Sequence, residues 1–372
     1  MKVLFNGSMY SEKPTGVGIF IREIFAKLVH LKLLSDKSTL YVYSPDELPH
    51  NNAVKTIKLP TPLEAVFKRS LSLHRIIWNF FFLPIIARKY NLVYSFSSHG
   101  SPFIKNQIVT VHDLICMQFP AQHKTQYYYF KYLMPAILKS CIKVVTVSHY
   151  TKAEVIKHYK IAPEKITVIS GAADHLQKAT SFNIPEKEKT VMEWLFGKRF
   201  FLTVGASYEH KNIERLIVAM KLLNNDDLLV IVGSGNAYYS MLKEKYTDAQ
   251  IHFLEYVSEP LLGYLYAHCI ANVYVSLYEG MGFPPYEAAI YNTVTIASNA
   301  TAIPEIYGDS VYYIDPLNTE SIAAALKLFS ESRIDKSSYQ RHFPALLKKY
   351  SWENTARAIH NLIQKEVEKQ SN

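Results

Sequence analysis

The sequence of 372 residues has few cysteines, no long apolar run and no recognisable leader. Its three cysteines, Cys116, Cys141 and Cys269, are scattered and form no CxxC pair, which argues against structural zinc and fits a reducing compartment. The chain begins MKVLFNGSMY, without the basic start, apolar core and small-residue cleavage site of a signal peptide. We therefore expect a cytoplasmic protein.

The most hydrophobic stretch, from Ile76 to Ile86, is far shorter than the roughly 20 residues that span a bilayer. Asn79 and Pro84 interrupt it, and basic residues flank it on both sides. This pattern is compatible with a helix at a membrane interface and equally with a core helix that has basic ends. The sequence does not separate the two interpretations.

Charge is distributed unevenly along the chain. The net charge is +9, with +13 in residues 1–170 and −4 in the remainder. A basic first half indicates an anionic neighbour, such as nucleic acid, an anionic lipid surface or a phosphorylated substrate, or else charge that serves solubility alone. No nucleic-acid-binding motif is present, so we expect no nucleic-acid partner.

Short β-branched and aromatic runs alternate with amphipathic helical patterns, an order typical of parallel sheets built from βαβ units. Strands are expected at residues 2–6, 40–43, 54–57, 92–96, 107–112, 143–147 and 166–170, and again at 200–205, 228–233, 251–254, 272–276, 294–298 and 311–314. Helices are expected along the stripe from Val17 to Leu31 and at 212–223, 260–269, 284–291 and 321–329. Two such series predict two doubly wound, Rossmann-like domains.

A polar stretch from Gly171 to Lys189 separates the two series and is the expected junction. We therefore expect an N-terminal domain over residues 1–175 and a C-terminal domain over residues 190–350. Residues 351–372 are predicted to form a helix with Ser351 as its N-cap. The apolar stripe of that helix needs a surface to cover, and we expect it to pack back on the N-terminal domain.

In open parallel sheets, ligands bind beyond the carboxyl ends of the strands, so candidate residues are sought there. Gly16 and Gly18 open the first helix after the first strand, where backbone amides can face an anion, although tight turns alone would also explain them. His112 ends a strand and can hydrogen-bond a substrate hydroxyl, or alternatively the local backbone. Lys211 lies near a helix start and can offer a charge to a phosphate, or can simply be solvated.

The most specific element runs from Glu279 to Glu287, in the sequence EGMGFPPYE. It follows a strand, contains Gly280 and Gly282, and leads into a helix opened by two prolines. Consecutive amides at a helix N-terminus suit a phosphate or sugar hydroxyls. Glu287, in the first turn, also stabilises its own helix.

With these motifs in order, the sequence resembles glycosyltransferase family 4, the retaining enzymes of GT-B fold. The matches cover most of the chain and comprise the glycine loop at 14–19, VHD at 111–113, VSHYTK at 147–152, VGxxxxxKN at 204–212, LYEGMGFPPYEAA at 277–289, PEIYGDS at 304–310, DPLNTESIAAAL at 315–326 and YSWENTA at 350–356. The resemblance implies two domains facing across a cleft, a nucleotide-diphosphate sugar as donor substrate, and no metal or other cofactor.

The resemblance also implies a role for each matching residue. His112 and Glu279 are the catalytic candidates, contacting the transferred sugar and its hydroxyls. The remaining implied residues bind the donor: Gly16 and Gly18 near the phosphates, Lys211 at the diphosphate, Gly280, Met281, Gly282 and Phe283 through their amides, Glu287 at the ribose, and Val257, with Tyr256, at the base.

Three positions depart from the family pattern. Many members carry an arginine in the loop where this chain has Ala206 and His210, which leaves Lys211 as the certain cation. Asn292 stands where a glycine usually follows the helix, and Glu255 stands where a glycine often precedes the base-binding loop.

The expected function is transfer of a hexose, with retention, to a saccharide or lipid-linked saccharide in surface polysaccharide or glycolipid synthesis. The basic first half suggests a peripheral position at the inner face of a membrane. The alternative is a catalytically weak or inactive sugar-nucleotide-binding partner subunit.

Overall fold

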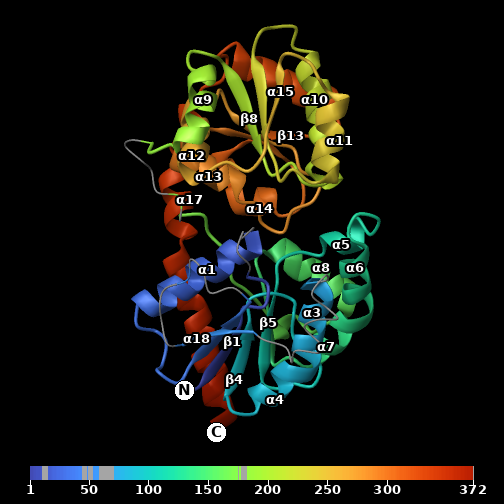
Figure 1. Cartoon of the computed structure of the whole chain (residues 1–372), viewed down its shortest axis with the longest axis vertical. Helices are drawn as coiled ribbons and strands as arrows, with labels where there is room; N and C mark the ends of the chain where they lie inside the picture. Colours follow the sequence, from blue (N-terminus) through green and yellow to red (C-terminus); the bar gives the residue numbers. More distant parts are fainter. Residues whose placement is uncertain are drawn as a thin grey trace. The chain divides into compact units, whose positions relative to one another are not determined.

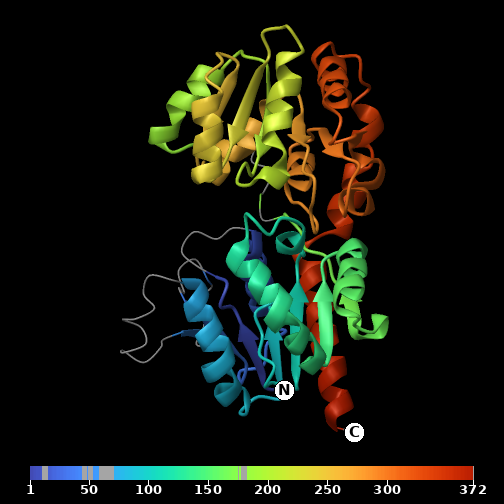
Figure 2. The same cartoon turned by 90° about the vertical axis from the view of Figure 1, so that its right-hand side faces the viewer.

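The computed structural model describes residues 1–10, 16–43, 48, 53–57, 71–174, 176 and 182–371. The chain forms two compact units, one comprising Met1–Ala172 with Tyr350–Asn372 and the other comprising Ala173–Lys349. Each unit is a parallel sheet covered by helices on both faces (Figures 1 and 2). Strand–helix alternation in the sequence predicts this architecture, and the structure confirms it.

The first unit contains seven parallel strands in the order β3-β2-β1-β4-β5-β6-β7. The strands are β1 (Val3–Asn6), β2 (Thr39–Val42), β3 (Val54–Thr56), β4 (Leu92–Ser95), β5 (Gln107–Val111), β6 (Lys143–Thr146) and β7 (Ile166–Val168). The helices are α1 (Gly16–His30), α3 (Leu71–Ile77), α4 (Leu83–Ala87), α5 (Ile115–Gln118), α6 (Lys124–Tyr128), α7 (Met134–Ser140), α8 (His149–Tyr159) and α18 (Trp352–Ser371), with π-helical turns at Trp78–Phe82 and Tyr129–Leu133 and a 3-10 turn at Pro163–Lys165. In Figure 1, α1 and α18 lie on one side of the strands and α3, α4 and α7 on the other.

The final helix, α18, belongs to the first unit. Trp352 and Ile359 are fully buried, and the Trp352 ring meets the Phe20 ring of α1 edge-on with centroids 5.8 Å apart. The Ser351 hydroxyl accepts a hydrogen bond from the Asn354 amide at 3.2 Å, so Ser351 caps the helix as its sequence predicts. The predicted apolar stripe thus covers α1.

The hydrophobic stretch from Ile76 to Ile86 is amphipathic. Trp78 and Leu83 pack into the core, whereas Phe81 and Ile85 are 65% and 62% exposed. One face of this stretch is therefore core, as one of the two interpretations expects. Contact of the exposed face with a membrane stays a prediction. Within the described residues, no helix is both long enough and apolar enough to cross a bilayer.

The second unit contains six parallel strands in the order β10-β9-β8-β11-β12-β13. The strands are β8 (Phe200–Val204), β9 (Leu228–Val232), β10 (Ile251–Leu254), β11 (Asn272–Tyr274), β12 (Thr295–Ser298) and β13 (Tyr312–Ile314). The helices are α9 (Glu186–Leu195), α10 (Ile213–Lys221), α11 (Ala237–Lys245), α12 (Glu259–His268), α13 (Pro284–Ile290), α14 (Ile303–Tyr307), α15 (Thr319–Ser330), α16 (Ser337–Gln340) and α17 (Phe343–Lys349), with 3-10 turns at Glu209–Lys211 and Gly308–Ser310. Figure 1 shows α9, α12 and α13 on one side of this sheet and α10 and α11 on the other.

Candidate active site

Loops at the carboxyl edge of the second sheet are tied together by backbone hydrogen bonds. The Gly205 amide donates to Val232 O at 2.9 Å, which joins the ends of β8 and β9. The Leu277 amide donates to His210 O at 2.7 Å, which joins the loop after β8 to the loop after β11. These bonds hold the predicted donor-binding segments side by side at the edge where parallel sheets bind ligands.

Lys211 and Glu279 form an ion pair at this edge. The Lys211 Nζ atom lies 2.7 Å from Glu279 Oε1, and the side chains are 19% and 11% exposed. The Lys211 ammonium also lies 5.5 Å from the centre of the Tyr274 ring. The structure therefore brings together two of the predicted residues, 68 positions apart in the sequence.

The charge state of Glu279 follows from this pairing. Burial raises the pKa of the Glu279 carboxyl, but the charges of Lys211 and His210 outweigh it and hold the pKa below its usual value. Glu279 is therefore a carboxylate at neutral pH and can accept hydrogen bonds from sugar hydroxyls.

The glycine turn after Glu279 contains backbone amides that are available as hydrogen-bond donors. None of the amides of Gly280, Met281 and Gly282 donates to a protein acceptor within the described residues. Gly282 has φ of +77°, and an added Cβ would lie 2.8 Å from the Tyr274 ring, so only glycine fits here. The turn leads into α13 at Pro284, so these amides lie at a helix N-terminus, where an anion is favoured.

Glu287 lies in the first turn of α13 and is buried. Its Oε2 accepts a hydrogen bond from the Tyr266 hydroxyl of α12 at 2.7 Å. Burial raises the pKa of Glu287 to about 7, although the Tyr266 hydrogen bond opposes the shift. Its hydrogen-bond partner is therefore a tyrosine, while its predicted contact with a ribose stays a prediction.

The segment predicted to receive the base lies after β10. Tyr256 is 79% exposed, whereas Val257 packs partly against the apolar cluster that includes Leu261. Glu255 is exposed and lies within 4 Å of where a Cβ on Gly235 would be. This loop adjoins the glycine turn after β9.

In the first unit, the predicted residues follow β1 and β5. Gly16 and Gly18 begin α1, while residues 14 and 15 of the same glycine loop lie outside the described residues. His112 Nε2 donates to Phe96 O at 2.8 Å, and the ring meets Phe20 edge-on at 4.7 Å. Burial lowers the pKa of His112, so the ring is neutral with its proton on Nε2.

The free nitrogen of His112 is Nδ1. No hydrogen-bond partner of this atom occurs in the part of the chain that the structure describes. The predicted interaction of His112 with the backbone is therefore present, and Nδ1 remains able to accept a hydrogen bond from a substrate hydroxyl.

The structure describes the residues at which the sequence departs from the family pattern. Ala206 and His210 are both buried, so neither supplies a surface cation near Lys211. Asn292 has φ of +59°, the left-handed conformation that a glycine would otherwise serve. Asn212 also has positive φ, and its side-chain amide donates to Val275 O and Pro316 O at 3.1 and 2.7 Å, which fixes the start of α10.

Four supporting residues are missed by the sequence reasoning: Tyr266, Tyr274, Thr301 and Tyr307. The Thr301 hydroxyl accepts from the Glu279 amide at 3.1 Å, and the Tyr307 hydroxyl donates to Gly282 O. All four stand in strands, helices or tight turns where aromatic and β-branched residues are expected for packing. No local pattern distinguishes them from ordinary core residues.

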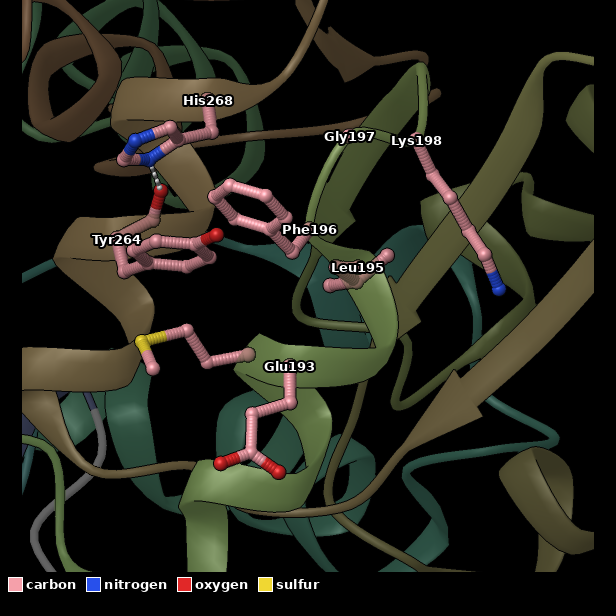
Figure 3. Close-up of a pocket in the computed structure, with 8 residues that line it drawn as sticks. Glu193, Leu195, Phe196, Gly197, Lys198, Tyr264 and His268 are labelled. Atoms are coloured by element: carbon pink, nitrogen blue, oxygen red, sulfur yellow. Dashed lines mark hydrogen bonds between the residues drawn. The ribbon is translucent and has the colours of Figure 1, made fainter.

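A cavity of about 730 Å³ lies elsewhere in the second unit. Figure 3 shows Tyr264 and His268 of α12 facing Phe196 and Leu195 at the end of α9. The Phe196–Lys198 turn precedes β8, so this cavity opens at the amino edge of the sheet, opposite to Glu279. Among the described residues, no group of three or more His, Cys, Asp or Glu side chains is placed to hold a metal ion.

Comparison with known proteins identifies the family of the chain. The family model "Glycosyltransferase Family 4" matches residues 15–175, and "Glycosyl transferases group 1" matches residues 186–343. The chain is similar to the O-antigen chain mannosyltransferase RfbU of Salmonella typhimurium, with 31% identity over 71% of both chains, and to O-antigen chain mannosyltransferase B of Escherichia coli, with 26% identity over 69% of this chain and 71% of that one.

Solved structures show the same fold at low sequence identity. Anabaena Alr3699/HepE, in complex with UDP and glucose, has a TM-score of 0.73 at 16% identity, covering 98% of this chain and all of that one. WaaG, a glycosyltransferase of lipopolysaccharide biosynthesis, has a TM-score of 0.67 at 15% identity, covering 97% of this chain and 99% of that one. The chain therefore belongs to glycosyltransferase family 4 and has the GT-B fold that its sequence predicts.

Proposed function

We propose that this glycosyltransferase moves mannose from a nucleotide-diphosphate sugar to a saccharide or lipid-linked saccharide acceptor in the assembly of a surface polysaccharide such as an O-antigen. Two relatives with known activity, from Salmonella and Escherichia coli, are O-antigen chain mannosyltransferases by name. These names support mannose as the hexose that the sequence leads us to expect.

The observation that carries the proposal is the Lys211–Glu279 ion pair beside the unused amides of Gly280, Met281 and Gly282. A cation and helix-terminal amides stabilise the negative charge that develops on a leaving diphosphate. A carboxylate held at low pKa accepts hydrogen bonds from the hydroxyls of the sugar. Lys211 and the turn amides thus suit a phosphate, and Glu279 suits sugar hydroxyls.

We propose transfer with retention by attack from the face that the leaving group occupies. The bond between sugar C1 and the phosphate oxygen breaks, and its electron pair remains on the diphosphate. The acceptor oxygen bonds to C1 from the same face and passes its proton to the departing phosphate oxygen. Glu279 is already paired with Lys211, which favours a binding role over that of a covalent nucleophile. Detection of a mannosyl adduct on Glu279 by mass spectrometry would refute this route.

The same groups support transfer without a metal cofactor. Lys211 and the turn amides supply the positive potential that a divalent cation would otherwise supply at the diphosphate. We expect full activity in the presence of EDTA. If EDTA abolished activity and Mg²⁺ or Mn²⁺ restored it, the proposal of metal-independent transfer would be overturned.

We further propose that the enzyme acts at the cytoplasmic surface of a membrane. The first 170 residues carry a net charge of +13, and the exposed Phe81 and Ile85 offer apolar contacts on the same unit. Both features favour an anionic lipid surface. Binding to vesicles that is independent of anionic lipid and of salt would contradict this proposal.

The deciding experiment is a transfer assay with GDP-mannose, UDP-glucose and dTDP-sugars, in which NMR of the product gives the anomeric configuration. Glu279→Gln is expected to lower kcat/KM by about 100-fold, the typical loss when a preorganised charge interaction is removed. Glu331→Gln is the matched control, because Glu331 lies on the surface of the same unit and its side chain is 41% exposed.

A second candidate function is a sugar-nucleotide-binding subunit without activity of its own. The loop after β8 favours it, because Ala206 and His210 leave this loop without the arginine found in many family members. Equal turnover in the wild type and in Glu279→Gln, with donor binding retained, would support this candidate against the enzyme.

A further inference from the structure

Arg75 in α3 is a partly buried cation for which the described residues supply no acidic partner. Its Nε donates to Ser8 O at 2.9 Å. For Nη1 and Nη2, neither a hydrogen-bond acceptor nor a carboxylate within 4.0 Å occurs among the residues that the structure describes. Neither Nη atom is among the fully buried polar atoms of the described residues that lack a partner. Both are therefore open to solvent and can donate hydrogen bonds to a bound ligand.

The position of Arg75 is fixed by the core. Asn79 Nδ2 donates to Arg75 O at 2.7 Å, and Asn79 Oδ1 accepts from Asn6 Nδ2 at 2.7 Å. Asn6 is the last residue of β1 and is buried. These bonds attach the end of α3 to the carboxyl end of β1, so the Arg75 side chain starts from a rigid base and not from a flexible surface.

The neighbours of Arg75 that the structure describes, Ser8, Tyr43 and His99, are polar and uncharged. Burial, and next the charge of Arg75, lower the pKa of His99 to about 3, so that ring is neutral. Burial raises the pKa of the Tyr43 phenol, which therefore keeps its proton. Ser97 Oγ lies 3.3 Å from His99 Nδ1 at the end of β4. Burial lowers the pKa of the Arg75 guanidinium, but an arginine still carries its charge at neutral pH. That charge lies at the carboxyl edge of the first sheet, where parallel sheets bind ligands.

We propose that Arg75 binds an oxyanion carried by the acceptor, a phosphate or diphosphate held by the two free Nη atoms. The planar fork of a guanidinium matches two phosphate oxygens. The anion has two chemical sources, the diphosphate of a prenyl-linked saccharide or a phosphate on the saccharide itself. Its assignment to the acceptor rests on the proposed function, in which the donor occupies the second unit.

Binding is tested with two probes, farnesyl diphosphate and mannose 1-phosphate, by calorimetric titration of the full chain. Arg75→Gln is expected to weaken the preferred probe by about 10- to 100-fold, the range for a lost charged hydrogen bond. Arg75→Lys keeps the positive charge but lacks the planar guanidinium fork. Its affinity for the probe is expected to lie between those of the wild type and Arg75→Gln. Arg88→Gln removes an equal charge from an exposed position after α4, at the other end of this helical run, and should bind as the wild type does. A preference for farnesyl diphosphate identifies a lipid-linked acceptor, and the reverse preference identifies a phosphorylated saccharide.

Kinetics separate this role from a structural one. Arg75→Gln should raise the KM for an acceptor with a diphosphate and leave unchanged both the KM for its uncharged octyl glycoside counterpart and the affinity for the nucleotide sugar. Equal losses with both acceptors, or unchanged binding of both probes, would overturn the proposal. Circular dichroism melting shows whether Arg75→Gln is folded, and Arg75→Lys carries the test if it is not. If none of the tested nucleotide sugars supports transfer, the proposed function fails. The titrations with the two probes still measure whether Arg75 binds an oxyanion.

Discussion

Replacing Lys211 with methionine leaves the Glu279 carboxylate with its counter-ion removed. Breaking a buried ion pair by removing one partner destabilises a protein by about 3 to 5 kcal/mol. The side chains of Lys211 and Glu279 are 19% and 11% exposed, which places the expected loss at the lower end, about 3 kcal/mol. The loss should fall on β11 and α13, which flank Glu279.

The loss should depend on pH with a defined sign. In the wild type the pKa of Glu279 lies below the ordinary glutamate value of 4.5. The stability from the pair is therefore present above about pH 4.5 and is lost as the pH falls through the lowered pKa of the folded protein. Without Lys211, burial dominates and the pKa of Glu279 rises. Lysine removal should therefore cost less at about pH 5 than at about pH 7.5, because the protonated carboxyl is the easier form to bury.

Hydrogen exchange of β11 and α13, measured by mass spectrometry, reports this local stability. A loss of about 3 kcal/mol corresponds to exchange about 100-fold faster in Lys211→Met. Lys221→Met is the matched control, since the Lys221 pair with Asp248 is 42% and 43% exposed and such surface pairs contribute little to stability. The double variant Lys211→Met/Glu279→Gln should recover part of the loss. Equal exchange in Lys211→Met and Lys221→Met, or a loss that is the same at both pH values, would refute the reasoning.

Two further predictions concern the same loops. Gly282→Ala should lower the free energy of unfolding by about 2 to 4 kcal/mol in thermal unfolding, through backbone strain and overlap with the Tyr274 ring. The control Gly197→Ala is also at positive φ, but an added Cβ there has nothing within 4 Å, so it should lose only about 1 kcal/mol. Equal losses in the two variants would contradict the overlap. Because the folded pKa of Glu287 is raised to about 7, its contribution to stability is full below about pH 4.5 and is lost as the pH rises through the folded pKa. Tyr266→Phe removes the bond that favours the charged form, so this loss should extend to higher pH in pH-dependent unfolding, and an unchanged profile would count against it.

The sequence predicts the sheets well because each strand is a short apolar run followed by a turn. The predicted strands all occur, with ends shifted by at most two residues, as for β11, which ends at Tyr274 where Ser276 was expected. The helix α9 begins at Glu186, inside a stretch expected to be irregular. Its acidic first turn is a helix signal, but the surrounding polar composition hides it.

The candidate site is predictable only where its residues are neighbours in sequence. The turn from Glu279 to Glu287 carries its own signal, because two glycines and two prolines specify a loop and a helix start. Tyr266 and Thr301 reach the site from other elements of the second unit, by contacts that only the fold creates. The same applies to Arg75, whose neighbour Ser8 is 67 residues away.

The attachment of α18 to the first unit has a consequence for biosynthesis. The polypeptide leaves the first unit after Ala172 and returns to it at Tyr350. The face of α1 that Trp352 covers must therefore stay bare on the ribosome while the whole second unit is translated. The unit that emerges first is the last to be completed, which exposes it to chaperones throughout synthesis. A stable recombinant first unit would need α18 joined back to its end.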